Sequence, residues 1–544
     1  MKRAPSLAAG VAVLWIALAH AATPPAEKRR LVLCNDGGTL AAPSMEAPIG
    51  VEGLVRATID PLRGTMIDTL YWQLGTDLHH GAFPARLSDW YSHRTKVGAI
   101  WGSDREIFRT AAEWRIFENT RTLFEQGTDP AAVVIEHGHK AGLDVFLALR
   151  INDGHDAKLP GGLTDPNMAP QRRARTDWLL GDDAALMEGI GGLAGQARTG
   201  YDFARPEVRS YMLALVAEAV ANYDLDGFDL DFCRQPSLFK KGEAEKSSPL
   251  LTQLLRDIRA ALDAKSRAVK RPLFLSVRVP PDLSATKKIG LDVATWITER
   301  LVNIVVVGDP GGWNYRLPIE RFVELAKGTG CKILAQNLCA FREDRGRSAS
   351  VLFGERNYYT TEQFRAVAAR HWQAGADGMF IWNQHFLKYS ADDRFDPQSW
   401  REIGDPAVLA SKNKHYLVGP TGRGGSLPIE LAAAGARANV NVEIADDVSG
   451  ERKRGTKVRA TLRLSIDQLT ALDRVEFRLN DSALDRASAI VRLNYNDCWL
   501  DFDVTDTIRK GSNALTLTVT GRNPHVAAPL VVRSVEALVT FEGL

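Results

Sequence analysis

The sequence predicts an α/β protein, a (β/α)8 TIM barrel followed by a C-terminal all-β sandwich domain. Short apolar strands alternate with amphipathic helices from residue 31 to about 385, which indicates repeated βα units. Eight such strands over roughly 350 residues fit a closed barrel with long insertions. From residue 418 the segments alternate apolar and polar residues, with almost no helical periodicity, which is typical of a sandwich. An open doubly wound sheet is the alternative, but no G-x-G-x-x-G follows the first strand.

The predicted elements are short strands and longer helices in regular succession. The eight strands are Leu31–Asp36, Met66–Gln73, Asp144–Asn152, Gly227–Phe232, Leu273–Val279, Asn303–Val307, Lys332–Asn337 and Gly378–Asn383. The helices are Trp114–Gln126, Ala131–Ala141, Glu207–Asn222, Pro249–Lys265, Ile319–Lys327 and Thr361–Ala374. Insertions near 77–113 and 153–200 follow the second and third strands, on the face of a barrel where loops build specificity.

The two ends of the chain suggest how it is divided. We expect a signal peptide over 1–22, the barrel domain over 23–417, a linker over 418–427 and the sandwich over 428–544. Lys2 and Arg3 precede an apolar run over Leu7–Leu18, and Ala19–Ala21 supplies a small-x-small cleavage pattern. The run is short for a membrane span. We therefore expect a secreted or periplasmic protein whose mature chain does not insert into the membrane; an uncleaved anchor is the alternative.

Composition excludes several classes of function. The net charge of +2 gives no strong field for nucleic acid or an anionic membrane. Five cysteines at irregular spacing form neither a disulfide framework nor a zinc pattern, so we expect buried thiols. The sequence lacks G-x-S-x-G, a phosphate loop and H-E-x-x-H, which argues against esterase, kinase and zinc-protease functions. We expect no cofactor and no resident metal.

The segment Y-D-L-D-G-F-D-L-D-F-C-R, residues 223–234, is the most informative part of the chain. It follows a long amphipathic helix and alternates strictly, with Phe228 and Leu230 on one face and Asp229 and Asp231 on the other. A barrel strand that packs outward on helices and presents acids at its C-terminal end has this pattern. Two carboxylates on one strand face are costly to bury unless they are paired, solvated or used.

These acids fit the chemistry of a glycosidase, which needs two carboxyl groups about 5–5.5 Å apart for retention or about 6.5–9.5 Å apart for inversion. Asp231, nearer the strand end, is the candidate nucleophile or charge stabiliser, and Asp229 is a further catalytic candidate. Asp309, after the sixth strand, is the favoured general acid/base, and Asp153, after the third, is next. Asp36 ends the first strand and is also considered. The structural alternative is a salt bridge from either β-strand acid to Arg150 or Arg278.

Polar residues suited to holding a sugar lie at the other predicted strand ends. Arg150 and Asn152 share a face of the third strand, and Ser276 and Arg278 share a face of the fifth; either Gln336 or Asn337 ends the seventh. The substrate-binding candidates are Asp36, Arg150, Asn152, His155, Arg234, Arg278, Asn337, Trp382, Asn383 and His385. His155 with Asp153 and Asp156 would instead suit a metal-assisted hydrolase, an alternative weakened by the absence of a fixed ligand spacing.

Four segments in order resemble a known family: H-x-A-G-L-D-V-F-L-A-L-R-I-N-D at 139–153, D-W-L-L at 177–180, Y-D-F-A-R-P-E-V-R-S-Y-M at 201–212, and the motif at 223–234. They are similar to the bacterial glycosyl hydrolase-like barrels called family-10-like, most strongly over 131–236. The resemblance implies a TIM barrel acting on glycans, with Asp231 matching the Asp at the end of the fourth strand. Arg234 of the family's D-x-x-R-Y-P pattern is kept, whereas Gln235 replaces the aromatic residue. The paired glutamates of the true family 10 xylanases have no counterpart at the strand ends.

The sequence thus predicts an exported glycoside hydrolase with a carbohydrate substrate and a two-carboxylate mechanism. A catalytically inactive glycan-binding protein on the same scaffold is the alternative from another class. The C-terminal domain either binds carbohydrate or has a structural role. Trp499 is its only tryptophan, and we expect it to pack in the core.

Overall fold

The structure is a computed structural model. It describes residues 30–35, 37–41, 48–74, 111–154, 172, 174–186, 194–233, 236–309, 316–337, 340–341, 357–358, 360–382, 397–419, 425–494 and 496–542. None of the helices in these ranges combines the length and the apolar composition that crossing a membrane requires.

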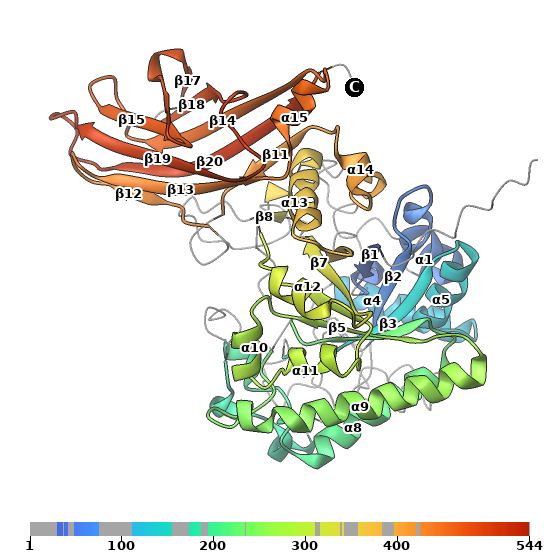
Figure 1. Cartoon of the computed structure of the whole chain (residues 1–544). Helices are drawn as coiled ribbons and strands as arrows, with labels where there is room; N and C mark the ends of the chain where they lie inside the picture. The colour runs from blue at the N-terminus through green and yellow to red at the C-terminus, as the bar shows by residue number, and fades with distance from the viewer. Residues whose placement is uncertain are drawn as a thin grey trace, which may run out of the picture.

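The N-terminal domain is a closed barrel of eight parallel strands, as predicted (Figure 1). Its strands follow the order β1-β10-β7-β6-β5-β4-β3-β2, so neighbours in the barrel are also neighbours in the succession of βα units. The bounds are β1 Leu31–Asn35, β2 Thr69–Leu74, β3 Asp144–Arg150, β4 Gly227–Asp231, β5 Phe274–Val279, β6 Ile304–Val307, β7 Lys332–Asn337 and β10 Gly378–Trp382. All eight predicted strands are therefore confirmed, most of them one or two residues shorter than expected. A two-stranded sheet pairs β8 (Ala340–Phe341) with β9 (Asn357–Tyr358).

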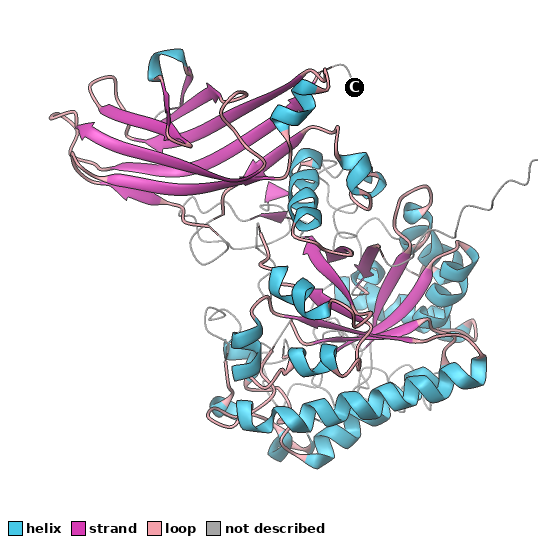
Figure 2. Cartoon of the chain, in the orientation of Figure 1, coloured by secondary structure: helices cyan, strands magenta, loops and turns pink. Residues whose placement is uncertain are grey.

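Helices surround the barrel (Figure 2). They are α1 Gly50–Thr58, α4 Ala111–Glu125, α5 Pro130–Lys140, α7 Ala194–Ala197, α8 Pro206–Asn222, α9 Ala244–Val269, α10 Leu283–Lys288, α11 Val293–Thr298, α12 Glu320–Ala326, α13 Thr361–Gln373 and α14 Pro406–Leu409. Local chemistry sets several of their starts: Asp129 caps α5, which begins with Pro130, and Thr360 forms a capping box with Gln363 at α13. The six predicted helices are confirmed, while α1, α7, α10, α11 and α14 were not predicted.

The C-terminal domain is a sandwich of two antiparallel sheets. One has the order β11-β20-β14-β18-β17 with β12 also paired to β20, and the other has the order β13-β19-β15-β16. The elements are β11 Lys414–Leu417, β12 Ile429–Leu431, β13 Arg437–Ile444, α15 Val448–Lys453, β14 Val458–Asp467, β15 Arg474–Leu479, β16 Ser482–Leu484, β17 Ile490–Asn494, β18 Asp497–Asp503, β19 Gly511–Gly521 and β20 Leu530–Phe541. Alternate residues of the long strands fill one core between the sheets.

The sandwich begins earlier than predicted, because β11 lies within the range assigned to the barrel domain yet pairs with β20. The two domains meet at α13, which lies beside β11 in Figure 1. There the buried Arg370 of α13 donates from Nε and Nη2 to the carbonyl oxygen of Glu443, at 2.9 and 2.6 Å, and from Nη1 to that of Leu417, at 2.9 Å. A buried guanidinium bonded to backbone oxygens of two sandwich strands fixes the second domain to the barrel.

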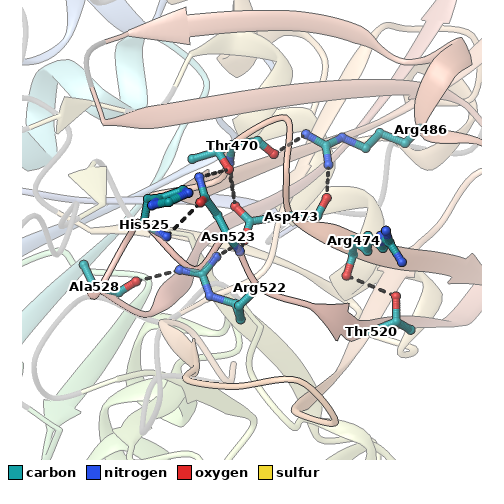
Figure 3. A network of polar contacts seen from close by, with 9 residues as sticks. All are labelled: Thr470, Asp473, Arg474, Arg486, Thr520, Arg522, Asn523, His525 and Ala528. Carbon is teal, nitrogen blue, oxygen red and sulfur yellow. Dashed lines mark hydrogen bonds and ion pairs between the residues drawn. The ribbon is translucent and has the colours of Figure 1, made fainter.

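A network of polar contacts closes one end of the sandwich (Figure 3). At its centre the buried Asp473 pairs with Arg522 and accepts hydrogen bonds from the backbone N–H groups of Asn523 and Thr470, both at 2.8 Å. Arg486 donates to the carbonyl oxygens of Asp473 and Thr470. Burial would raise the pKa of Asp473, but these hydrogen bonds and Arg522 lower it. The network ties the loop after β14 to the loop after β19.

Candidate active site

The barrel strands divide their side chains between two cores. One set, including Leu230 and Val277, packs against the surrounding helices. The other set, including Tyr71, Phe146 and Phe380, fills the barrel interior. Gly227 makes room for this interior packing, since a Cβ there would lie 2.4 Å from the Phe146 ring. The lower interior is thus a packed aromatic core.

Above this core the inward positions become polar. Asp231, the last residue of β4, lies beside Arg150 of β3 and Arg278 of β5 in the strand register. Its Oδ2 accepts a 2.7 Å hydrogen bond from Nη1 of Arg278, and its Oδ1 accepts one of 2.9 Å from the backbone N–H of Cys233. Both partners of the ion pair have side chains only 1% exposed. The salt bridge to Arg278 that the sequence left open as an alternative is therefore present.

Arg278 lies among side chains of several strands. Its Nε and Nη2 both donate to Oε1 of Gln336 on β7, at 2.9 and 2.7 Å, and its guanidinium carbon lies 4.9 Å from the centre of the Trp382 ring on β10. Gly308, after β6, leaves space for this arrangement, because a Cβ there would lie 2.2 Å from Gln336 Oε1. The charge of Asp231 raises the pKa of Arg278 against the effect of burial. The guanidinium is thus oriented by three strands at once.

Asp229 lies one inward position below Asp231 on β4, opposite Ser276 of β5. It is 1% exposed, and one of its oxygens has no hydrogen-bond partner among the described residues. Burial raises the pKa of Asp229 to about 7; the Ser276 hydroxyl and Arg278 oppose the rise, and the charge of Asp231 adds to it. The two acids of the motif therefore have different environments: Asp231 is bonded to an arginine, whereas Asp229 is near its point of protonation at neutral pH.

The end of β3 contributes a second ion pair. Nη1 of Arg150 lies 3.3 Å from Oδ2 of Asp153, and both side chains are buried. Asn152 has a different role from the one predicted: its amide accepts from the backbone N–H of Tyr201 and donates to the carbonyl oxygens of Tyr201 and Ser237. Because β3 ends at Arg150, Asn152 does not continue the inward face of the strand and instead holds two loops together.

Asp309 follows β6 and is half-buried, whereas Asp153, Asp229 and Asp231 are buried. It comes directly after Gly308, whose carbonyl oxygen lies 3.1 Å from Sγ of Cys233. The chain therefore brings the start of the loop after β4 against the start of the loop after β6. Cys233 is completely buried, so it is a packed thiol.

Asn337 is a second substrate-binding candidate, after Asn152, that the structure places away from the barrel interior. Its Oδ1 lies 3.0 Å from Nδ1 of His371 on α13, on the helix side of the barrel wall. Burial lowers the pKa of His371 to about 3, which keeps the imidazole neutral. Gln336, not Asn337, is the inward residue at the end of β7, because neighbouring residues of a strand point to opposite faces.

Five predicted site residues lie outside the described residues: Asp36, His155, Arg234, Asn383 and His385. Asp156 of the alternative metal cluster also lies outside them. Within the described ranges, no group of three or more His, Cys, Asp and Glu side chains is arranged to hold a metal ion.

The sequence predicted correctly that four residues lie at one end of the barrel: Asp231, Arg278, Arg150 and Trp382. It did not predict the roles of Gly308 and Cys233. Gly308 had a signal, since it follows an apolar strand at an inward position where any side chain would enter the barrel. Cys233 had a weaker one, because it stands two residues after Asp231 in the alternating motif.

Comparison with solved structures finds barrel proteins of low similarity. An endo-β-1,4-mannanase from Thermotoga petrophila is 11% identical, with 93% of this chain and 97% of that chain covered and a TM-score of 0.43. An α-amylase from Geobacillus thermoleovorans is 11% identical, with coverages of 91% and 98% and a TM-score of 0.38. The PgaB (BpsB) glycoside hydrolase domain from Bordetella bronchiseptica is 11% identical, with coverages of 69% and 98% and a TM-score of 0.37.

No family model matches the sequence, and no curated protein matches it. At such identities and TM-scores the solved structures carry no information about this chain's chemistry. Its function must be inferred from its own residues.

Proposed function

We propose that this protein is a glycoside hydrolase whose site is the C-terminal end of the barrel. The observation that carries the proposal is the carboxylate of Asp231, oriented by Arg278 and by the Cys233 N–H where the ends of β4 and β6 come together. Cleavage of a glycosidic bond passes through an oxocarbenium-like transition state, which a fixed negative charge stabilises. The family resemblance of the motif at 223–234 also supports a glycan substrate.

The surroundings of the four acids suggest their roles. Asp231 is the charge stabiliser, since two hydrogen-bond donors fix its orientation and reduce its nucleophilicity. Asp309 is the general acid/base, because it follows Gly308, which contacts Cys233 after β4, and is half-buried, so a substrate can reach it. Asp153 forms an ion pair with Arg150. Asp229, with a pKa of about 7, carries a proton much of the time and limits the negative charge beneath Asp231.

The test begins with a screen of the full-length protein on polysaccharides and aryl glycosides. On any substrate that is cleaved, Asp231→Asn and Asp309→Asn should each lower kcat at least about 100-fold. Asp257→Asn, an exposed position on α9, is the matched control and should be unchanged. Full activity in the Asp231→Asn variant would end the assignment.

Leaving groups separate the two roles. A general acid matters less when the leaving group needs no proton. On a dinitrophenyl glycoside, kcat of Asp309→Asn should therefore be much closer to that of the wild type. Asp231→Asn should remain slow on the same substrate, because stabilisation of positive charge is needed whatever the leaving group. A recovery in Asp153→Asn but not in Asp309→Asn would transfer the acid role to Asp153.

A second candidate is a protein that binds glycans without cleaving them. The burial of both motif acids favours it: Asp229 is 1% exposed and Asp231 is 2% exposed. Calorimetric titration with oligosaccharides that remain intact after long incubation would support this candidate, and turnover of any of them would exclude it.

Export to the periplasm or the medium is also part of the proposal, and it rests on the leader-like pattern of residues 2–21. After expression of the full chain in a bacterium, the N-terminus of the exported protein should lie near Ala22 or Thr23. An intact N-terminus in the cytoplasmic fraction alone would contradict it.

A further inference from the structure

The outer face of one sandwich sheet carries Trp499, whose indole lies outside the hydrophobic core of the domain. In β18, Cys498, Leu500 and Phe502 enter the sandwich core, so Trp499 and Asp501 lie on the opposite face. The expectation that Trp499 packs in the core is therefore wrong. Trp499 lies between Arg492 of β17 and Ser465 of β14 in the strand register.

A charged row runs beside this indole. Asp501 accepts from Nε and Nη2 of Arg463 at 2.9 and 3.0 Å, and its oxygens lie 3.0 and 2.9 Å from the two terminal nitrogens of Arg492. Burial would raise the pKa of Asp501, but the two arginines lower it. Glu536 of β20 lies opposite Arg463 in the strand register, so two carboxylates face two guanidinium groups and the charges of this row balance. The Arg492 side chain is 48% exposed, so its remaining donor hydrogens are accessible.

Trp499 itself is only partly buried. Among the described residues its indole N–H has no hydrogen-bond acceptor, and its ring stacks on no aromatic or cationic group. A tryptophan in a core usually has both, since burying an unpaired N–H is costly. In Trp499 the N–H and part of the ring remain accessible to solvent.

The position of Trp499 separates this face from the barrel. The sandwich contacts α13 through β11 and β13, whereas β17 and β18 lie at the opposite edge of the sheet from β11. A ligand on Trp499 would therefore be held by the second domain alone.

We propose that this outer face, made by Trp499, Arg492, Asp501 and Arg463, is a saccharide-binding site. A pyranose ring would stack on the indole, and its hydroxyl groups would accept from Arg492, which Asp501 holds in place. An apolar plate beside charged hydrogen-bonding groups matches a sugar, which has an apolar ring face and a rim of hydroxyls. The choice of a saccharide rests on the proposed function; the geometry of the face does not.

The experiment is affinity electrophoresis of the full chain in gels containing soluble derivatives of cellulose, chitin, mannan or xylan. Trp499→Ala and Arg492→Ala should weaken retardation by at least one polymer about tenfold. Trp499→Phe, which keeps an aromatic ring, should restore most of it. The matched control is Leu472→Ala, which removes another exposed apolar side chain of the sandwich, 62% exposed, and should behave as the wild type.

Hydrolysis of a small aryl glycoside, measured in the same variants, separates this inference from the proposed function. The rate should not change in Trp499→Ala, since the residue is remote from the barrel. Retardation that is unchanged in Trp499→Ala, or absent for the wild type on every polymer, overturns the saccharide site even if the protein is an active hydrolase. Retardation that depends on Trp499 without cleavage of any substrate supports the site and removes the proposed function.

Discussion

Two Asp–Arg pairs stand at opposite ends of the same strand, β4, and differ mainly in their access to water. The floor pair is Asp226 with Arg271, where β4 begins; the mouth pair is Asp231 with Arg278, where it ends. Side-chain exposure is 17% and 30% in the floor pair but 1% and 1% in the mouth pair. Asp226 also accepts from the Val145 N–H at 2.8 Å, so it anchors the start of the neighbouring strand.

The comparison shows which pair needs an explanation beyond folding. The floor pair joins two loops in contact with water, where an ion pair costs little and contributes little. The mouth pair removes two charges from water at a place where apolar side chains of the same size would pack at lower cost. A buried pair of this kind at the C-terminal end of a barrel is where a functional constraint is expected.

The largest expected effect is on stability. Arg278→Leu leaves the carboxylate of Asp231 buried without its partner, so we expect it to lower the free energy of unfolding by about 3–5 kcal/mol. Arg271→Leu, the matched change in the floor pair, should cost at most about 1 kcal/mol. Urea denaturation of both variants measures the difference. Equal losses would show that burial does not distinguish the two pairs.

The protonation of Asp229 should appear in the pH dependence of stability. Its pKa of about 7 in the folded state lies far above that of an unfolded chain, so the folded state holds a proton that the unfolded state has lost between roughly pH 4 and 7. Stability should therefore fall as pH rises through this window, by about 4 kcal/mol for this group. Asp229→Asn should remove most of that fall. Urea midpoints at pH 5 and pH 8 for both proteins test this, and an equally steep fall in the variant would contradict it.

Gly308 gives a smaller test of how the mouth pair is held. A Cβ at this position would lie 2.2 Å from Oε1 of Gln336, the atom that accepts two hydrogen bonds from Arg278. Gly308→Ala should cost about 1–3 kcal/mol and reduce turnover through Arg278. Gly195→Ala is the matched control, since a Cβ there would meet no atom within 4 Å. Wild-type stability in Gly308→Ala would mean that Gln336 can move without loss.

The sequence predicted the fold and the inward face of β4 well, because strict alternation of apolar and acidic residues leaves one arrangement of Asp229 and Asp231. It also paired Ser276 with Arg278 on one face of β5. Which arginine would reach Asp231 was not predictable, since that depends on the stagger between strands. Arg150 and Arg278 are both in register with Asp231, and Arg278 bonds to it at 2.7 Å.

Two of the three errors, those at Asn152 and Asn337, occur where a strand ends. Asn152 shares parity with Arg150 in the sequence, but β3 ends at Arg150 and the asparagine turns to the Tyr201 backbone. Gln336 and Asn337 are adjacent polar residues, so composition could not decide which of them faces inward. Trp499, the only tryptophan of the second domain, was expected in the core, whereas the alternation of β18 assigns it to the outer face.

The smallest expected effect concerns His139, a further partner of Asp226 beside the floor pair. Nε2 of His139 lies 2.8 Å from Oδ2 of Asp226, and this carboxylate raises the pKa of His139. A raised folded-state pKa contributes stability that is present below the unfolded value of about 6.5 and is lost as pH rises through the folded value. Because the pair is partly exposed, the contribution should stay under about 1 kcal/mol.

His139→Gln should therefore be less stable than the wild type at pH 5.5 and equal to it at pH 9, with His137→Gln on the same helix as the control. The contribution of His139 to stability is lost above about pH 6.5, whereas that of Asp229 is lost mostly below pH 7. The two contributions therefore separate in a series of urea midpoints from pH 4 to 9. If the stability lost in His139→Gln grows as pH rises, the neutral imidazole, not the charged one, stabilises Asp226. The contact between His139 and Asp226 would then be a neutral hydrogen bond, in contrast to the ion pair of Asp231 with Arg278.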